Sequence, residues 1–341
     1  IRTMRGLGWF VSLVVAIILA SPSPSAAQGS ATPRARITAQ VSEANLTTLR
    51  GNIHPLARAQ YDQGKTDPSL QLQRITILFQ PTPAQQAGLD ALLAAQQNPT
   101  SPSFHQWLTP EQYGDRFGIA QVDLDKVAAW LQAKGFAIVE IPSSRNWIVF
   151  KGTAAQVEST FHTEIHNYAT TTGRRFHANY TEPSVPSTLA GLVAGFRGLN
   201  NYPIKPRAIK QSTLSSSLEP NFTSSSSGRN FLAPDDFATI YDLKPLYNST
   251  PAIDGTGQKI VIVGQTNIVL NDIATFRSLS GLPAKVPQVI LVPGSTNPGV
   301  RDGDVQEASL DIEWSGAVAR NATIIYVYAD PTTGGVFDSL Q

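Results

Sequence analysis

Two acidic residues, Glu307 and Asp311, lie four positions apart in the stretch DGDVQEASLDIEWSGAVARNATIIYVYAD, near the end of the chain. Four residues make about one helical turn, so both carboxylates are expected on one face of a helix. Like charges at this spacing cost an isolated helix roughly 0.2–0.5 kcal/mol, which a solvated helix can tolerate. A partly buried pair would instead share a proton and raise the pKa of one acid. The spacing therefore allows a solvated face or a proton-handling site.

The residues around the two acids favour burial of this helix. Apolar side chains recur on both sides of the acids, at Leu310, Trp314 and Val318 on one side and at Ala308 and Ile312 on the other. A helix with apolar residues on both sides of its acids is predicted to be half buried. The pattern alone leaves both interpretations of the pair open.

Composition excludes several other kinds of site. The 341 residues carry a formal net charge of +1, which gives no electrostatic reason to expect nucleic acid or an anionic membrane as partner. There is no cysteine, so disulfides, thiolate catalysis and cysteine-ligated zinc are excluded. We expect no cofactor or metal site in this chain.

Other segments with charged or metal-ligating side chains give weaker indications of a functional site. The segment DGTGQ lacks the spacing of a phosphate-binding loop and is interpreted as a turn before a strand. RDGDV resembles half a calcium loop without the downstream ligands, and a solvated turn is expected there. A helix break near Thr163 would separate His162 from His166, so we expect structural roles for these residues and for His177.

The first 27 residues are predicted to be a signal peptide. Arg2 and Arg5 precede the apolar run LGWFVSLVVAIILA, which gives way to the small residues of SPSPSAAQGS, with cleavage expected after Ala27. The run is shorter than the ~20 residues that span a bilayer, although an uncleaved anchor is the alternative. We therefore expect a secreted, extracellular protein with no membrane contact after cleavage.

Residues 28–202 are predicted to form an α+β domain. Residues 30–70 show no clear period, and regular patterns begin at Arg74. Strands are expected at 74–80, 136–142, 146–152 and in the pair 164–180; helices at 83–98, 122–135 and 153–163, the last with Thr153 as N-cap. This order predicts a split βαβ, ferredoxin-like pattern with helices on one face of an antiparallel sheet.

A change of composition separates this domain from a second one. Residues 203–230 are rich in Ser, Pro and Lys and are predicted to be an exposed linker, open to proteolytic cleavage. In residues 231–341, apolar strands (259–266, 287–293 and 322–330) alternate with helices. This pattern predicts an incomplete α/β domain whose parallel sheet is covered on both faces.

Several segments in this order resemble the sedolisins, also called serine-carboxyl peptidases. FHQWLTPEQYGDRFG, VAAWLQAKGFAIVEIPSSRNWIVFKGTAAQVESTFHTEIHNY and HANYTEPSVPSTLAGLVAGFRGLNN are similar to the kumamolisin-type activation (pro) domain. LAPDDFATIYDLKPLYN, DGTGQKIVIVGQTNI and EASLDIEWSGAVARNATIIYVYA resemble the start of the sedolisin catalytic domain, which has a subtilisin-like fold. The likeness covers nearly all of the chain after the signal peptide.

The resemblance implies roles for the two acids. Glu307 matches the general base of the family's Ser-Glu-Asp triad, and Asp311 matches the aspartate that orients it. The family's Gly-Thr-Ser nucleophile motif, oxyanion aspartate and calcium loop lie further along and have no counterpart up to Gln341. No nucleophile is therefore assigned, and calcium is expected only for a complete family enzyme. The sequence is interpreted as a preproenzyme truncated within its catalytic domain and inactive as given.

Two functions follow from the resemblance. The first is the secreted pro-form of an acid-acting serine endopeptidase, with protein substrates and a pro-domain that packs on its own catalytic domain. The alternative is a non-catalytic protein whose pro-domain acts as an inhibitor or folding assistant of a complete sedolisin.

Overall fold

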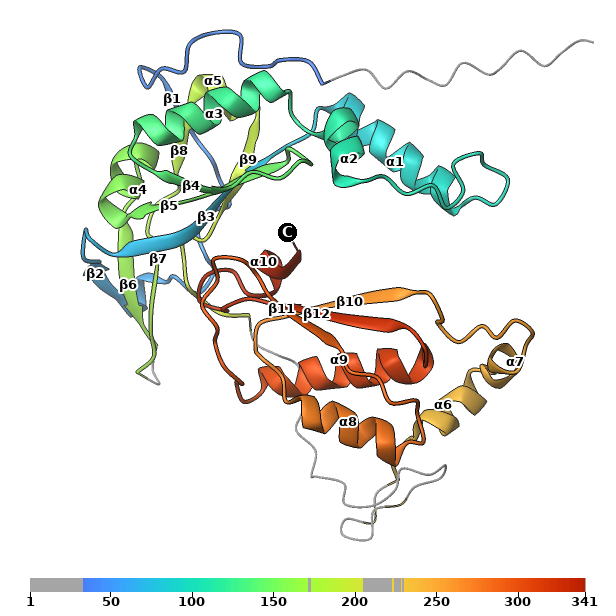
Figure 1. Cartoon of the computed structure of the whole chain (residues 1–341). Coiled ribbons are helices and arrows are strands. Elements are labelled where there is room, and N and C mark those ends of the chain that lie inside the picture. Colours follow the sequence, from blue (N-terminus) through green and yellow to red (C-terminus); the bar gives the residue numbers. More distant parts are fainter. Residues whose placement is uncertain (1–32, 171–172, 205–222, 224–227, 229, 341) are drawn as a thin grey trace, which may run out of the picture.

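The computed structural model describes residues 33–170, 173–204, 223, 228 and 230–340 (Figure 1). The predicted signal peptide, residues 1–27, and most of the predicted linker lie outside the described residues. None of the described helices is long and apolar enough to cross a membrane.

A four-stranded antiparallel sheet with the order β4-β5-β3-β9 forms the centre of the first part of the chain. Its strands are β3 (Gln71–Phe79), β4 (Ala137–Glu140), β5 (Trp147–Thr153) and β9 (Val193–Arg197). The helices α3 (Gln121–Ala133), α4 (Ala154–Phe161) and α5 (Ser187–Ala190) cover one face of it (Figure 1). Side chains alternate along β3, so Ile75 and Ile77 are buried in this core and Arg74 and Thr76 point to the opposite face.

Two smaller antiparallel sheets flank this core. They are β2 (Asp62–Lys65) with β6 (Ile165–Ala169) and β7 (Arg175–Asn179), and β1 (Leu46–Thr48) with β8 (Ser184–Pro186). The 3-10 helix η1 (Ala59–Tyr61) precedes β2, and α1 (Pro83–Gln97) and α2 (Pro110–Phe117) project to one side (Figure 1). The sequence did not predict β1 or β2, because strands of three or four mostly polar residues show no measurable period.

Threonine side chains begin three of the helices. Thr82, Thr109 and Thr153 each accept a hydrogen bond from the backbone N–H three residues later. The side-chain oxygen of the glutamine at that position accepts a hydrogen bond from the backbone N–H of the threonine. These capping boxes satisfy backbone N–H groups that the first helical turn leaves without partners. The prediction of Thr153 as an N-cap is confirmed.

The second part of the chain contains a parallel sheet with the order β10-β12-β11. Its elements are α6 (Pro234–Ile240), α7 (Lys244–Tyr247), β10 (Lys259–Gly264), α8 (Leu270–Leu279), β11 (Gln288–Leu291), α9 (Asp304–Val318), β12 (Thr323–Tyr328) and α10 (Val336–Leu340). Figure 1 shows α8 and α9 on one side of the sheet and α10 at the end nearest the first part. On the face that α9 covers, its residues Ala308 and Ile312 pack against Ile324 and Tyr326 of β12.

The expectation that helices cover both faces of this sheet is wrong for the described residues. Val261 and Ile290 lie on the face away from α9, and these residues are 58% and 44% exposed. Apolar strands indicate that both faces can be buried, but sequence pattern does not say which element covers each face.

Candidate active site

Glu307 and Asp311 line one cavity of about 140 Å³ at the carboxyl end of β10. The cavity is also lined by Ile204, Val263, Gly264, Gln265, Asp304, Ala308 and Val336. The walls therefore come from the end of β10, the first two turns of α9, the start of α10 and the chain that leaves the first part. The carboxyl ends of parallel strands are where open α/β sheets bind ligands.

The packing of α9 places the two acids at the rim of this cavity. Ala308 and Ile312 are buried against the sheet, at 6% and 2% exposed. Each acid precedes one of these residues and so lies about 100° around the helix from it. Both acids keep exposed surface at this rim and Leu310 is 48% exposed, so α9 is half buried, as predicted, with its acids toward the exposed side. The apolar stripe that packs on the sheet is the one containing Ala308 and Ile312.

Charge at the start of α9 distinguishes the two acids. Glu307 lies in the first turn of the helix, where the helix dipole favours negative charge. Partial burial, and then the neighbouring charge of Glu307, raise the pKa of Asp311 above its ordinary value. Asp311 therefore keeps a proton to higher pH than a solvated aspartate, which suits a hydrogen-bond donor beside a carboxylate.

A polar side chain that the sequence analysis did not identify lies between the acids and the first part of the chain. The Nε2 group of Gln265 donates to Asp304 Oδ1 at 2.8 Å and to the carbonyl oxygen of Ile204 at 2.8 Å. Arg301 Nε donates to the other oxygen of Asp304 at 3.1 Å. The only available signal was the place of Gln265, directly after an apolar strand. The segment RDGDV thus supplies a partner for Gln265 rather than a purely solvated turn.

The histidines do not form a site in the structure. His162 ends α4 in the left-handed conformation, with φ 51°. His166 lies in β6, with Nδ1 2.9 Å from Asp62 and Nε2 3.2 Å from Glu164. Burial lowers the pKa of His177 to about 4. Within the described residues, no group of three or more His, Asp or Glu side chains is arranged to hold a metal ion.

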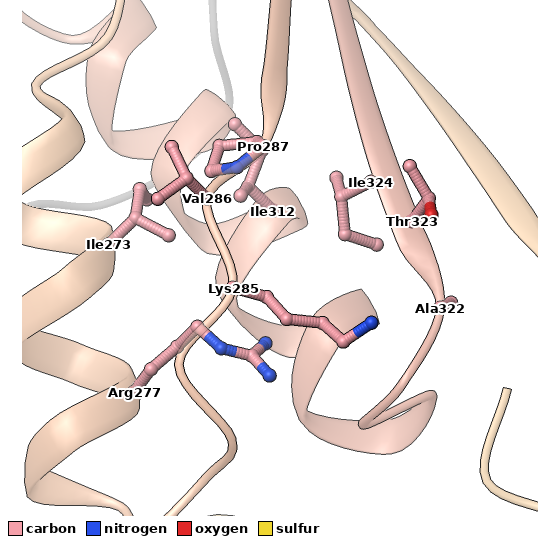
Figure 2. A pocket seen from close by; sticks show the side chains of 9 residues that line it. All are labelled: Ile273, Arg277, Lys285, Val286, Pro287, Ile312, Ala322, Thr323 and Ile324. Atoms are coloured by element: carbon pink, nitrogen blue, oxygen red, sulfur yellow. The ribbon is translucent and has the colours of Figure 1, made fainter. Parts of the chain in front are cut away.

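A second cavity lies near the other end of α9, and its cationic side chains have structural partners (Figure 2). Arg277 is 4% exposed and donates to three backbone carbonyl oxygens, at 2.6, 3.1 and 2.9 Å. Lys285 Nζ donates to the carbonyl oxygen of Asn321 at 2.8 Å. These cations therefore satisfy carbonyl groups at the end of α9 and in adjoining loops.

Known proteins share sequence with this chain, and a family model matches much of its first part. Residues 59–202 match the family model described as Pro-kumamolisin, activation domain. Xanthomonalisin of Xanthomonas sp. (strain T-22) is 30% identical over 258 residues, which cover 74% of this chain and 30% of that protein. Sedolisin of Pseudomonas sp. (strain 101) is 25% identical over 254 residues, which cover 73% of this chain and 42% of that protein.

A third relative is also similar to most of this chain over less than half of its own length. Kumamolisin of Bacillus sp. (strain MN-32) is 24% identical over 237 residues, which cover 68% of this chain and 41% of that protein. The chain thus spans less than half the length of each of these relatives. The matched activation domain and the three relatives show that the chain belongs to the sedolisin family of serine-carboxyl peptidases.

Proposed function

We propose that this chain belongs to the secreted precursor of an acid-acting serine endopeptidase, in which Glu307 is the general base and Asp311 orients it. One observation supports this most strongly. The two carboxylates line a single cavity at the carboxyl end of a parallel sheet, beside the segment that leaves the activation domain. Protein and peptide chains are the proposed substrates.

The chemistry uses a carboxylate where many serine peptidases use histidine. Glu307 accepts the proton of an attacking serine hydroxyl, and the protonated Asp311 donates a hydrogen bond that orients the glutamate. A glutamate remains partly ionised near its ordinary pKa of about 4.3, whereas a histidine would be fully protonated there and unable to act as base. Among the described residues that line the cavity none is a serine, so the nucleophile must come from other residues.

The activation domain is proposed to cover the catalytic part until the linker, residues 203–230, is cut. The order β4-β5-β3-β9 supports a split βαβ, ferredoxin-like arrangement for this domain. Export would depend on the signal peptide proposed for residues 1–27.

A chimera tests the catalytic roles of the two acids. Residues 33–340 would replace the matching part of xanthomonalisin, so that the interface between the two parts is preserved and the rest of that protein is retained. We expect cleavage of a denatured protein at about pH 4, and a loss of roughly 10²–10⁴-fold in kcat after Glu307→Gln. Asp311→Asn should also lower kcat, while Asp90→Asn, an exposed acid on α1, serves as control. An active chimera that is indifferent to Glu307→Gln refutes the proposal.

The second candidate function is inhibition or assisted folding of a complete sedolisin by the activation domain. It is favoured by the buried contact of Arg74 in this domain with Asp338 in the second part. Adding the 341-residue chain to an active sedolisin would test it. A slower rate of peptide cleavage supports this function, and an unchanged rate at saturating chain concentration excludes it.

A further inference from the structure

A buried ion pair joins the activation domain to the second part of the chain. Arg74 on β3 and Asp338 on α10 are 264 residues apart in sequence, and Arg74 Nε lies 2.8 Å from Asp338 Oδ2. Each side chain is only 2% exposed. The helices α3, α4 and α5 cover one face of the four-stranded sheet, and Figure 1 shows α10 opposite the other face.

A second arginine of the same sheet contacts the other oxygen of this carboxylate. Arg197 Nη2 lies 3.6 Å from Asp338 Oδ1, and its guanidinium lies 4.5 Å from the ring centre of Phe337. Arg74 also approaches the carbonyl oxygen of Pro293 at 3.4 Å through Nη1 and Glu140 of its own sheet at 3.4 Å through Nη2. One carboxylate of α10 is thus held between two guanidinium groups.

The backbone of the activation domain holds these two arginines side by side. Thr76 of β3 pairs with Arg197 of β9, which places Arg197 beside the strand that carries Arg74. Gly198 follows with φ 79°, and a Cβ atom there would overlap with the carbonyl oxygen of Arg74. Only glycine permits this close approach. The cationic site is therefore built into the sheet and does not depend on a flexible loop.

The burial of these charges makes the contact selective. Burial raises the pKa of Asp338, and the two guanidinium groups oppose that rise. If Asp338 were neutral, the buried Arg74 would keep, among the described residues, only its 3.4 Å ion pair with Glu140 and would lie beside the partly buried Arg197, and this costs more than losing an exposed ion pair. A buried charged pair therefore discriminates strongly between partners that carry the matching charge and those that do not.

We infer that the Arg74–Arg197 pair is the recognition site of the activation domain and that its partner is a sedolisin-type catalytic domain with a carboxylate at the position of Asp338. Catalytic domains with a neutral or cationic residue there would be bound weakly. The inference relies on the proposed function only in taking α10 as part of a catalytic domain. It does not require Glu307 or Asp311 to be catalytic.

Cleavage of the chain between its two parts tests this inference. A site for a specific protease is inserted among residues 205–222 of the full chain, the chain is cut, and the affinity of the two pieces is measured by size exclusion and titration. We expect the wild-type pieces to stay together and Asp338→Asn to weaken their association by about 100-fold or more. Arg197→Gln, at a side chain that is 25% exposed, should weaken it less.

Matched variants separate recognition from loss of folding. Arg145→Ala removes an ion pair within the activation domain, at 2.9 Å from Asp115, and should leave the association unchanged. Arg74→Met combined with Asp338→Leu removes both buried charges and should bind better than Asp338→Asn alone. Asp338→Asn and Arg197→Gln pieces that associate as tightly as wild type would overturn the inference, as would wild-type pieces that separate. If the Asp338→Asn variant does not fold, the affinities of the Arg197→Gln variant and of the double variant still test the inference. If Glu307 and Asp311 proved not to be catalytic, the affinities of the two pieces would be unaffected.

Discussion

Gln265 and Ile204 are joined by a hydrogen bond of 2.8 Å between the side-chain amide and the backbone carbonyl oxygen, although they are 61 residues apart. The bond brings the end of the activation domain to the cavity that Glu307 and Asp311 line. The same amide donates to Asp304, in the first turn of the helix that carries both acids. One buried side chain therefore links the departing chain to the helix of the candidate active site.

We predict that Gln265→Leu destabilises the chain by about 1–3 kcal/mol. The variant keeps the apolar volume but leaves the carbonyl of Ile204 and one oxygen of Asp304 without their donor. Urea unfolding, monitored by circular dichroism, measures the change in the free energy of unfolding. Gln86→Leu is the control, because Gln86 is exposed and bonds only to Asp90 on its own helix. Equal losses for the two variants would show that Gln265 has no special role.

The pKa of Asp311 is predicted to fall in a Glu307→Gln variant. Burial is the larger cause of the raised pKa and should persist, while the repulsion from the Glu307 carboxylate disappears. Titration of carboxyl carbons by NMR in the full chain measures this directly. Glu43→Gln, in the activation domain, should leave the titration of Asp311 unchanged. An unchanged pKa after Glu307→Gln would mean that the two acids are not electrostatically coupled.

Long, regular segments were predictable from sequence. The strand of 322–330 and the helix that carries Glu307 and Asp311 appear in the structure as β12 and α9, since their periodic apolar residues pack locally. The Thr153 cap was also predictable, since a capping box involves residues only three positions apart.

Contacts between distant residues were not predictable in the same way. Gln265 with Ile204 and Arg74 with Asp338 depend on how whole elements pack, and local periodicity holds no information on such pairs. Leu310 shows a related limit, because two apolar stripes on one helix do not reveal which of them faces the sheet. The positions of the two acids followed from the pattern, but their exposure did not.

The capping box of α4 predicts a modest and specific loss of stability. Thr153 Oγ1 accepts from the N–H of Gln156 at 3.2 Å, and Gln156 Oε1 accepts from the N–H of Thr153 at 2.7 Å. Thr153→Ala should therefore lower the free energy of unfolding by about 1 kcal/mol. Thr153→Ser keeps the hydroxyl and should retain most of the stability. A serine variant as unstable as the alanine variant would assign the effect to the lost methyl group.

Glu313 predicts a dependence of stability on pH that is separate from the two candidate catalytic acids. Burial, and then the charge of Asp272 on α8, raise its pKa from 4.5 to about 7. A raised pKa in the folded state means that the protonated form is favoured by folding. The stabilising contribution is complete below the ordinary pKa of 4.5 and is lost as the pH rises through about 7.

Glu313→Gln should therefore remove a fall in stability between about pH 5 and about pH 8, a fall of at most about 3 kcal/mol in wild type. Glutamine resembles the protonated acid in size and carries no charge at either pH. Urea unfolding at several pH values measures the slope, with Asp90→Asn as the control at an exposed site. Parallel pH profiles for wild type and Glu313→Gln would show that Glu313 titrates alike in the folded and unfolded chain. If stability depends less on pH in Glu313→Gln but not in Asp90→Asn, the group that takes up the proton on folding is Glu313, at the contact between α8 and α9.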